Sequence, residues 1–193
     1  TLLSLRGFFA QAPLFLCFFA PAITMGAFTT EKERGTLELL MTMPVSDSQI
    51  VLGKFCSALF LLIVVFAMTL PYPLTLSIIA EQHGTYLDWG ATAAGYIGLV
   101  LLGGAYIAIG LMASSITRDQ VVAVLTGFSI CFGLYLLDGL VQEPSGEVLR
   151  VVEYLSTNAH FSDMARGVID LGDVVYYLSI IGVCLVIAQS TIA

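Results

Sequence analysis

Five long apolar runs, separated by short polar segments, constrain the fold of this chain more than any other feature. They cover residues 12–28, 50–80, 91–116, 121–140 and 174 onward. A helix needs about 20 apolar residues to cross the hydrocarbon core of a bilayer. The first run is shorter, but Phe8 and Phe9 extend it. The pattern therefore predicts an all-α, polytopic bundle of transmembrane helices with five crossings, forming a single domain over residues 1–193.

The composition supports a membrane location and argues against a nucleic-acid partner. Only 11% of the residues are charged, compared with about 25% in soluble domains, so polar side chains are too few to coat a water-facing globule. The net charge of −7 argues against nucleic acid, because neutralising phosphates requires clustered lysine and arginine. The cysteines lie inside apolar runs without CxxC spacing, so they are interpreted as small buried hydrophobes. They are Cys17, Cys56, Cys131 and Cys184.

The sequence lacks the motifs of the common hydrolytic chemistries. It has no HExxH and no GxSxG motif, and Gly53-Lys54 is followed by Phe55 rather than by the serine or threonine of a phosphate-binding loop. His83 and His160 are interpreted as exposed polar residues, because two ligands from distant loops make a poor metal site. We therefore expect no catalytic residue, no metal site and no cofactor in this chain.

The polar segment between the first two runs is short, charged and sharply bounded. Its charged residues are Glu31, Lys32, Glu33, Arg34 and Glu38. Thr30 and Glu33 have the spacing of a capping box, in which each side chain bonds the other residue's backbone N–H. This spacing predicts a helical turn that starts at Thr30. Gly35 interrupts that turn, because glycine suits a helix terminus better than a helix interior.

A short amphipathic helix is predicted after Gly35. The residues that share its apolar face are Leu37, Leu40 and Met41. Pro44 ends this helix because it cannot donate a backbone hydrogen bond. Ser46 and Gln49 then have the spacing of a second capping box, which starts the next long run. Two interpretations of residues 31–43 remain open at this point, a solvated loop and an element at the membrane surface that docks a soluble partner.

The sequence of this segment resembles a known family. The stretch TTEKERGTLELLMTMPVSDSQIVLGK, residues 29–54, looks like the cytoplasmic coupling segment of type-2 ABC exporter permeases. That family shows an acidic and basic cluster, then Gly-Thr-Leu-Glu, a proline, and Gly-Lys where the following membrane helix begins. The stretches LPYPLT, GLMASSITRDQVVA and HFSDMARGVIDLGDVVYYLS also resemble the family, so the resemblance extends over nearly the whole chain. The closest similarity is to the gliding-motility and nitrous-oxide-reductase-maturation permeases.

The resemblance implies a membrane subunit of an ATP-driven ABC exporter in the bacterial cytoplasmic (inner) membrane. Its expected partners are a dimer of ATPase subunits, which would bind ATP and Mg, a second copy of the permease or a related permease, and an accessory protein on the outer side. We also expect a further N-terminal crossing in the full chain, which would make six. The coupling residues carried over from the family are Glu31, Lys32, Glu33, Arg34, Gly35, Thr36, Leu37, Glu38, Leu40 and Met41.

Two other classes of function were weighed against this one. A non-catalytic membrane scaffold, which anchors partner proteins, would need neither a moving coupling helix nor an exit path, and it remains the alternative. A secondary transporter is disfavoured, because no crossing carries an ionisable residue at mid-membrane to bind a coupling ion. Asp138 lies near the far end of its run, and its carboxylate has two interpretations, a proton or substrate site and a group that simply reaches water, of which we favour the second.

Small residues and prolines predict how the helices pack. Pairs of small residues four positions apart recur in the run 91–116, and this spacing lets helix backbones approach closely. The pairs are Ala94 and Gly98, Gly104 and Ala108, and Gly110 and Ser114. They serve packing within the subunit or a contact in a dimer, and we favour the first. Pro71 and Pro73 remove two backbone donors, so we predict a helix break there, either at the membrane interface or in the transport path.

The remaining polar segments set the orientation. Residues 117–120 form a predicted tight turn on the cytoplasmic side, and residues 142–173 a predicted outer loop. Within that loop an amphipathic interfacial helix is indicated by Val148, Val151, Val152 and Leu155. With this orientation, the basic residues inside are Lys32, Arg34, Lys54 and Arg118, and those outside are Arg6, Arg150 and Arg166. This is a weak positive-inside bias, so the orientation depends mainly on the resemblance.

Overall fold

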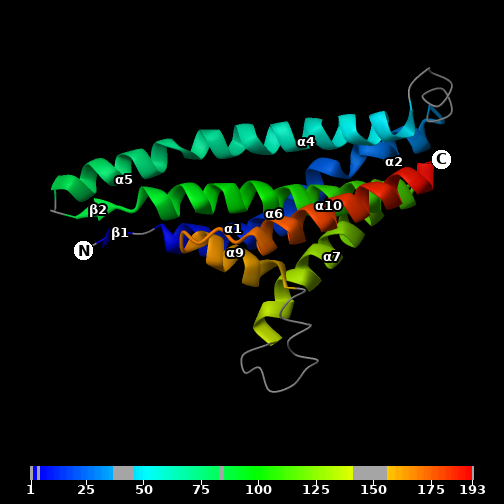
Figure 1. The fold of residues 1–193 in the computed structure, drawn as a ribbon. Coiled ribbons are helices and arrows are strands. Elements are labelled where there is room, and N and C mark those ends of the chain that lie inside the picture. The colour runs from blue at the N-terminus through cyan, green and yellow to red at the C-terminus, as the bar shows by residue number, and fades with distance from the viewer. Residues whose placement is uncertain (1, 4, 37–45, 83–84, 141–155, 193) are drawn as a thin grey trace.

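The fold is a bundle of helices (Figure 1). The computed structural model describes residues 2–3, 5–36, 46–82, 85–140 and 156–192. Within these residues, five helices are long and apolar enough to cross a membrane. They are Gly7–Glu33, Asp47–Gln82, Trp89–Ile116, Gln120–Leu137 and Leu171–Ile192. The predicted all-α class is confirmed, and each of these helices contains most of one predicted apolar run.

Helices α1 and α2 combine into one candidate span, and helices α4 and α5 combine into another. The helices are α1 (Arg6–Thr24), α2 (Gly26–Glu33), α4 (Asp47–Thr69), α5 (Pro71–Gln82), α6 (Trp89–Ile116), α7 (Gln120–Leu140), α9 (Thr157–Ala165) and α10 (Leu171–Ile192). Two strands of two residues each, β1 (Leu2–Leu3) and β2 (Tyr86–Leu87), pair in parallel at one end of the bundle. This short pair is the one departure from an all-helical chain among the described residues.

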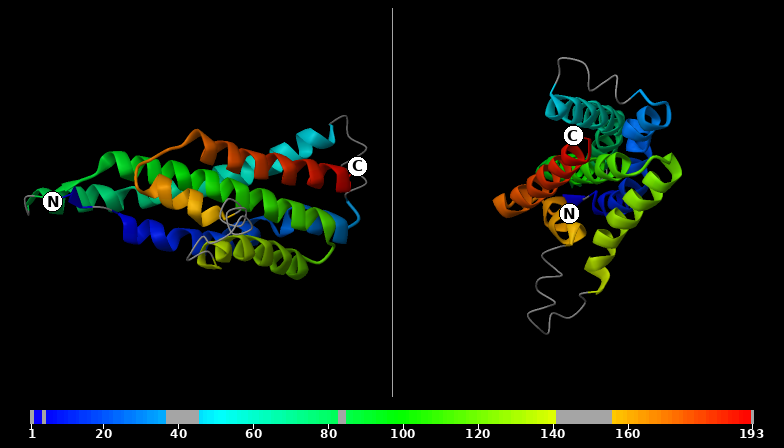
Figure 2. Two further views of the ribbon diagram at one scale, coloured as in Figure 1. Left: turned by 60° about the horizontal axis from the view of Figure 1, so that its bottom comes forward. Right: turned by 90° about the vertical axis from the view of Figure 1, so that its right-hand side faces the viewer.

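Helix α6 is the centre of the bundle. It contacts α1, α7 and α9 as well as α4 and α10, which Figure 2 shows around it. The glycines of α6 allow these close contacts, because side chains of the neighbouring helices occupy the space that a Cβ atom on each glycine would need. A Cβ on Gly103 would lie 2.5 Å from a methyl group of Leu62 in α4, and one on Gly95 would lie 2.5 Å from the ring of Phe9 in α1. These five helices, and α2 as well, can therefore pack closely against a single one.

The six small residues singled out in the sequence are all buried in α6. They are Ala94, Gly98, Gly104, Ala108, Gly110 and Ser114. A Cβ on Gly98 would lie 3.0 Å from Met164 of α9, and one on Gly104 would lie 3.4 Å from Ile181 of α10. One on Gly110 would lie 2.1 Å from the hydroxyl of Thr24 in α1. These contacts are all made within one chain.

The helix over residues 47–82 is interrupted beside its prolines. Helix α4 ends at Thr69 and α5 begins at Pro71, with Leu70 between them. The N–H of Leu70 bonds the carbonyl of Ala67 at 3.2 Å, which is the tighter turn expected where a helix ends. The Thr69 hydroxyl donates to the Phe66 carbonyl at 2.7 Å and bonds the hydroxyl of Tyr96 in α6 at 3.0 Å. The break thus coincides with Pro71 and is tied to the central helix.

Helix α2 corrects the predicted capping box at Thr30. Thr30 lies inside α2, which starts four residues earlier at Gly26, so the prediction of a new helical turn from Thr30 was wrong. The helix ends at Glu33, and Gly35, two residues later, has a φ of +67°. The N–H of Gly35 bonds the carbonyl of Lys32, and the N–H of Thr36 bonds that of Glu31, at 3.3 and 3.0 Å. This is the Schellman pattern of a helix C-terminus, as the glycine had suggested.

The second capping box is confirmed. Gln49 accepts a hydrogen bond from the backbone N–H of Ser46 at 3.1 Å, and α4 begins at Asp47. The predicted tight turn at residues 117–120 is also present, between α6 and α7. There the carboxylate of Asp119 accepts from the N–H of Val121 at 2.7 Å.

A short helix in the segment 142–173 packs into the bundle. The hydroxyl of Thr157, at the start of α9, bonds the hydroxyl of Tyr106 in the middle of α6 at 2.9 Å. After α9, Gly167 lies against Ala91 in the first turn of α6. Helix α9 thus lies beside the first half of α6. The predicted interfacial helix with Val148, Val151, Val152 and Leu155 lies outside the described residues.

Candidate functional site

The predicted coupling residues continue from the C-terminal end of α2. Glu31, Lys32 and Glu33 form its last turn, and Arg34, Gly35 and Thr36 follow it. The other predicted coupling residues lie outside the described residues. They are Leu37, Glu38, Leu40 and Met41.

The charges at the end of α2 divide into two groups. Glu31 and Lys32 are partly buried, and both use their charges within the chain. Lys32 donates to the carbonyl of Ser115 at the end of α6. Glu33 and Arg34 are exposed, as are the two residues after them. The sequence analysis assigned all four charges to contacts with a partner protein. In the structure, Glu31 and Lys32 hold α2 against the bundle, whereas Glu33 and Arg34 are exposed.

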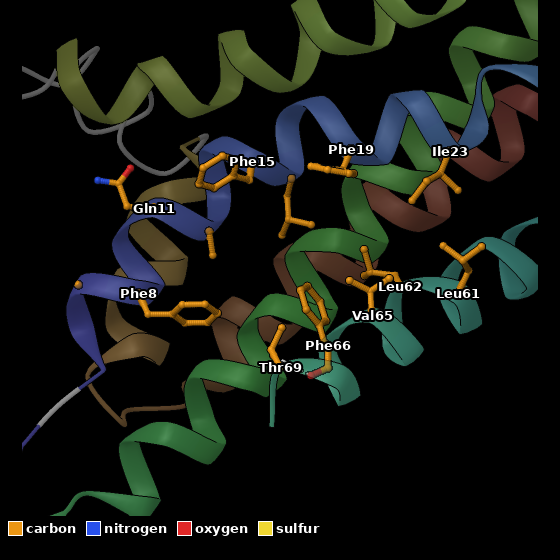
Figure 3. A pocket seen from close by; sticks show the side chains of 13 residues that line it. Phe8, Gln11, Phe15, Phe19, Ile23, Leu61, Leu62, Val65, Phe66 and Thr69 are labelled. Carbon is orange, nitrogen blue, oxygen red and sulfur yellow. Dashed lines mark hydrogen bonds between the residues drawn. The ribbon is translucent and has the colours of Figure 1, made fainter. Parts of the chain in front are cut away.

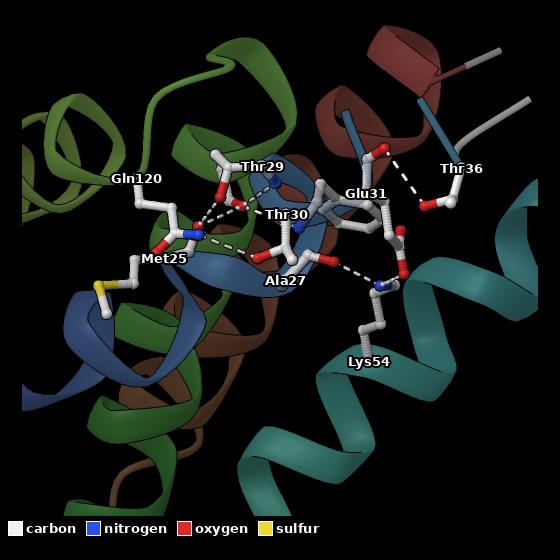
Figure 4. Close-up of polar contacts among 10 residues, drawn as sticks. Met25, Ala27, Thr29, Thr30, Glu31, Thr36, Lys54 and Gln120 are labelled. Carbon is white, nitrogen blue, oxygen red and sulfur yellow. Dashed lines mark hydrogen bonds and ion pairs between the residues drawn. The ribbon is translucent and has the colours of Figure 1, made fainter. Parts of the chain in front are cut away.

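Lys54 joins α4 to α2. Its ammonium forms an ion pair with Oε1 of Glu31 at 2.5 Å and also donates to the carbonyl of Ala27 (Figure 4). It lies 4.8 Å from the centroid of the Phe28 ring, close enough for a cation–π contact. Sequence reasoning had not placed Lys54 among the site residues. The sequence feature that could have identified Lys54 is its position in the Gly53-Lys54 pair, near the start of the second apolar run.

The turn between α6 and α7 lies beside α2. The amide of Gln120 at the start of α7 donates to the hydroxyl of Thr30 at 3.1 Å. Arg118 and Asp119 in this turn are exposed. The end of α2 is therefore attached to α4, α6 and α7, while its last exposed charges and those of the turn share one end of the bundle.

A separate apolar groove of about 570 Å³ lies between α1 and α4 (Figure 3). Its walls include Phe15 and Phe19 of α1 and Val65 and Phe66 of α4. Of the residues that line it, only Gln11 and Thr69 carry polar side chains. The groove therefore offers hydrocarbon contact and no charged group, so it is distinct from the polar site at the end of α2.

His160 is not the exposed histidine that the sequence suggested. Its side chain, on α9, is only 12% exposed, and its Nδ1 lies 2.6 Å from Oδ1 of Asp173 in α10. The imidazole also stacks on Tyr176, with ring centroids 4.2 Å apart. Burial follows from the packing of α9 into the bundle. His83 lies outside the described residues, and Asp138 lies near the end of α7.

The structure places no metal-binding cluster in the part of the chain that it describes. No group of three or more histidine, cysteine, aspartate or glutamate side chains gathers there. Asp163, which the sequence places close to His160, instead lies 3.8 Å from Arg166. The side chains at the end of α2 form ionic and hydrogen-bonding contacts with α4, α6 and α7.

Comparison with known protein families gives a match over most of the chain. The profile of the family described as ABC-2 family transporter protein matches residues 6–184. This range includes α2, the α6–α7 turn and most or all of each candidate membrane-spanning helix. A comparison with curated proteins found no match.

Proposed function

The chain belongs to the ABC-2 transporter family as a multi-pass membrane permease, and from this premise we propose that a separate ATPase drives it as an exporter. The ATPase subunits would bind ATP and Mg, and this chain would supply the path across the bacterial inner membrane. A dimer of permease chains, with an accessory protein on the outer side, completes the proposed assembly. Kinship with the gliding-motility and nitrous-oxide-reductase-maturation permeases is part of the proposal and depends on the sequence resemblance alone.

The division of charges at the end of α2 supports this function most directly. A segment that transmits force needs a firm attachment to the bundle and an exposed end for its partner. Glu31 and Lys32 provide the attachment, through Lys54 of α4 and the carbonyl of Ser115 in α6. Glu33 and Arg34 are exposed and can set the orientation and register of a soluble partner.

The proposed docking element continues beyond the described residues. Leu37, Leu40 and Met41 share a helical face in the sequence and would fill an apolar pocket of the ATPase. By its spacing in the sequence, Glu38 would fall on another face of that helix and contact the rim of the pocket. Closure of the ATPase on ATP would then move residues 31–43, and the attachments of α2 would carry the movement into the bundle.

A charge reversal tests the proposal. Replacing Glu33 with Arg and Arg34 with Glu should lower ATP-driven transport by about tenfold or more, because both charges would face partner groups of like sign. The bundle should stay folded, since both side chains are exposed. Transport and ATPase stimulation are measured in the permease–ATPase complex in vesicles. Stimulation at the wild-type level in this variant would contradict the proposed docking element.

A matched control is available at the other end of α6. Asp163 and Arg166 form an exposed pair 3.8 Å apart, with side chains 58% and 63% exposed. The same swap of charges there, D163R with R166D, should leave the coupling of ATP hydrolysis to transport unchanged. If the wild-type complex binds an ATPase through residues 31–43 but transports nothing, the alternative of a non-catalytic scaffold is favoured instead.

A further inference from the structure

Helix α2 has no N-terminal cap of its own. Helix α1 ends at Thr24, Met25 follows, and α2 begins at Gly26 without a side-chain hydrogen bond from its N-cap residue. The first backbone N–H groups of any helix lack acceptors within that helix, and inside a protein each unpaired group is costly. A partner from elsewhere in the chain is therefore needed where α1 passes into α2.

Ser114 of α6 is that partner. Its Oγ accepts hydrogen bonds from the N–H groups of Phe28 and Thr29, at 3.0 and 3.4 Å, and donates to the carbonyl of Met25 at 2.9 Å. A serine hydroxyl has one donor and two acceptor sites, so these three bonds use all of them. Ser114 is completely buried, so the groups that it pairs are shielded from bulk water. Figure 4 shows this junction around Met25 and Thr29.

The turn of α6 that precedes Ser114 is packed tightly against the end of α1, so α1 cannot shift along α6 at this point. Gly110 lies one turn before Ser114, and a Cβ atom there would lie 2.1 Å from Oγ1 of Thr24 and 3.1 Å from Cα of Pro21. From the other side, a Cβ on Gly127 of α7 would lie 3.1 Å from the Pro21 ring. The end of α1 is thus enclosed by two glycines, while Ser114 holds the start of α2.

We propose that Ser114 is a positioning residue, which fixes the direction in which α2 leaves α1 and passes the movement of α2 to α6. This inference rests on the proposed function, in which the end of α2 contacts the ATPase. Because α6 contacts α1, α4, α7, α9 and α10, a displacement of α6 reaches the whole bundle. The pair Gly110 and Ser114 therefore has a role beyond close packing, since the serine hydroxyl makes the contact that transmits movement.

The adjacent serine provides a matched control. Ser115 is also completely buried, but its hydroxyl donates to the carbonyl of Met112 in its own helix, at 2.7 Å. Its backbone carbonyl accepts from Lys32, and this bond is retained in Ser115→Ala. Ser114→Ala and Ser115→Ala thus remove the same group at neighbouring buried positions, and only the first removes a contact with α2.

The first measurement does not involve the ATPase. Spin labels on Glu33→Cys and Asp119→Cys, in full-length permease with the exposed Cys56 changed to Ala, report the distance between the end of α2 and the α6–α7 turn. Ser114→Ala should broaden this distance distribution, and Ser115→Ala should not. A distribution for Ser114→Ala that matches the parent protein would overturn the proposal. If Ser114→Ala does not fold, Ser114→Gly, which removes the same hydroxyl, takes its place with Ser115→Gly as its control and with the same criteria.

The second measurement uses the unlabelled complex with its ATPase. Ser114→Ala should lower the stimulation of ATP hydrolysis by the permease by about tenfold, because losing one buried hydrogen-bonding partner shifts the equilibrium between the positioned and displaced states of α2 by roughly that factor. Unchanged stimulation, despite a broadened distance, would show that Ser114 positions α2 without transmitting movement and would refute that half of the proposal. If the wild-type permease does not stimulate the ATPase, the proposed function fails, while the label distances still decide the role of Ser114 in positioning α2.

Discussion

Lys54 of α4 forms an ion pair with Glu31 of α2, with Nζ and Oε1 2.5 Å apart. These residues lie on either side of residues 37–45, so the pair fastens together the two ends of the proposed docking segment. The same ammonium donates to the carbonyl of Ala27 and lies over the Phe28 ring. A partner that pulls on the segment would therefore move α2 and α4 together, rather than stretch the connection between them.

Lys54→Met should destabilise the fold. The variant keeps an apolar stem but leaves the Glu31 carboxylate without its cation, and within the described residues Oε2 of Glu31 has no hydrogen-bond partner. The free energy of unfolding should fall by about 1–2 kcal/mol, less than for a fully buried pair because solvent screens the charges. The side chains of Lys54 and Glu31 are 23% and 26% exposed. Thermal unfolding in detergent, followed by circular dichroism, measures the change.

Adding Glu31→Gln to Lys54→Met should restore part of that loss, because no unpaired charge then remains. A double variant that is less stable than Lys54→Met alone would show that the carboxylate is stabilised by something other than Lys54. When Glu31→Gln alone is measured as well, subtracting the two single changes in the free energy of unfolding from the double change gives the interaction free energy of the pair.

Gly110→Ala should separate α1 from α6. The new methyl group would lie 2.1 Å from Oγ1 of Thr24, which is held by its bond to the Ala20 carbonyl at 2.9 Å. Overpacking of this kind should cost about 1–3 kcal/mol in the free energy of unfolding. Gly182→Ala is the control, because the exposed Gly182 in α10 has nothing within 4 Å of the new methyl. That variant should be neutral or more stable by about 0.5–1 kcal/mol, and equal losses in both would exclude crowding as the cause.

His160→Ala should destabilise the packing of α9 against α10. It leaves the Asp173 carboxylate buried without its imidazole partner, and Oδ2 of Asp173 already has no hydrogen-bond partner among the described residues. A loss of about 2–4 kcal/mol is expected for breaking a buried pair, whereas His160→Ala with Asp173→Ala should lose less because no buried charge remains. Arg166→Ala, which breaks the exposed pair with Asp163, should change the stability by less than about 0.5 kcal/mol. Unfolding curves that rank these variants in another order would contradict the buried pair.

The sequence predicts features that short stretches determine and misses those that depend on distant contacts. The crossings follow from runs of apolar residues, while the capping box at Ser46 and the end of α2 before Gly35 involve only residues that are close in sequence. The predicted start of α2 was wrong, because the residue that caps this helix is Ser114, more than 80 positions away along the chain. Neither the Lys54–Glu31 pair nor the packing of α9 on α6 has a periodic signature, because each depends on how complete helices pack. His160 was taken as exposed for the same reason.

Gly35→Ala should disturb coupling without destabilising the bundle. Gly35 has a φ of +67°, where a side chain is strained, but a Cβ atom there would meet nothing within 4 Å. The cost, about 1 kcal/mol, would therefore fall on the Schellman turn and favour a different exit direction from α2. Because the turn precedes the proposed docking segment, transport per ATP should fall while the unfolding temperature stays within a few degrees of wild type. Gly35→Asn should retain more of the coupling than Gly35→Ala, since asparagine adopts the left-handed conformation more readily. Equal coupling in the alanine and asparagine variants would show that the left-handed turn does not direct the segment towards its partner.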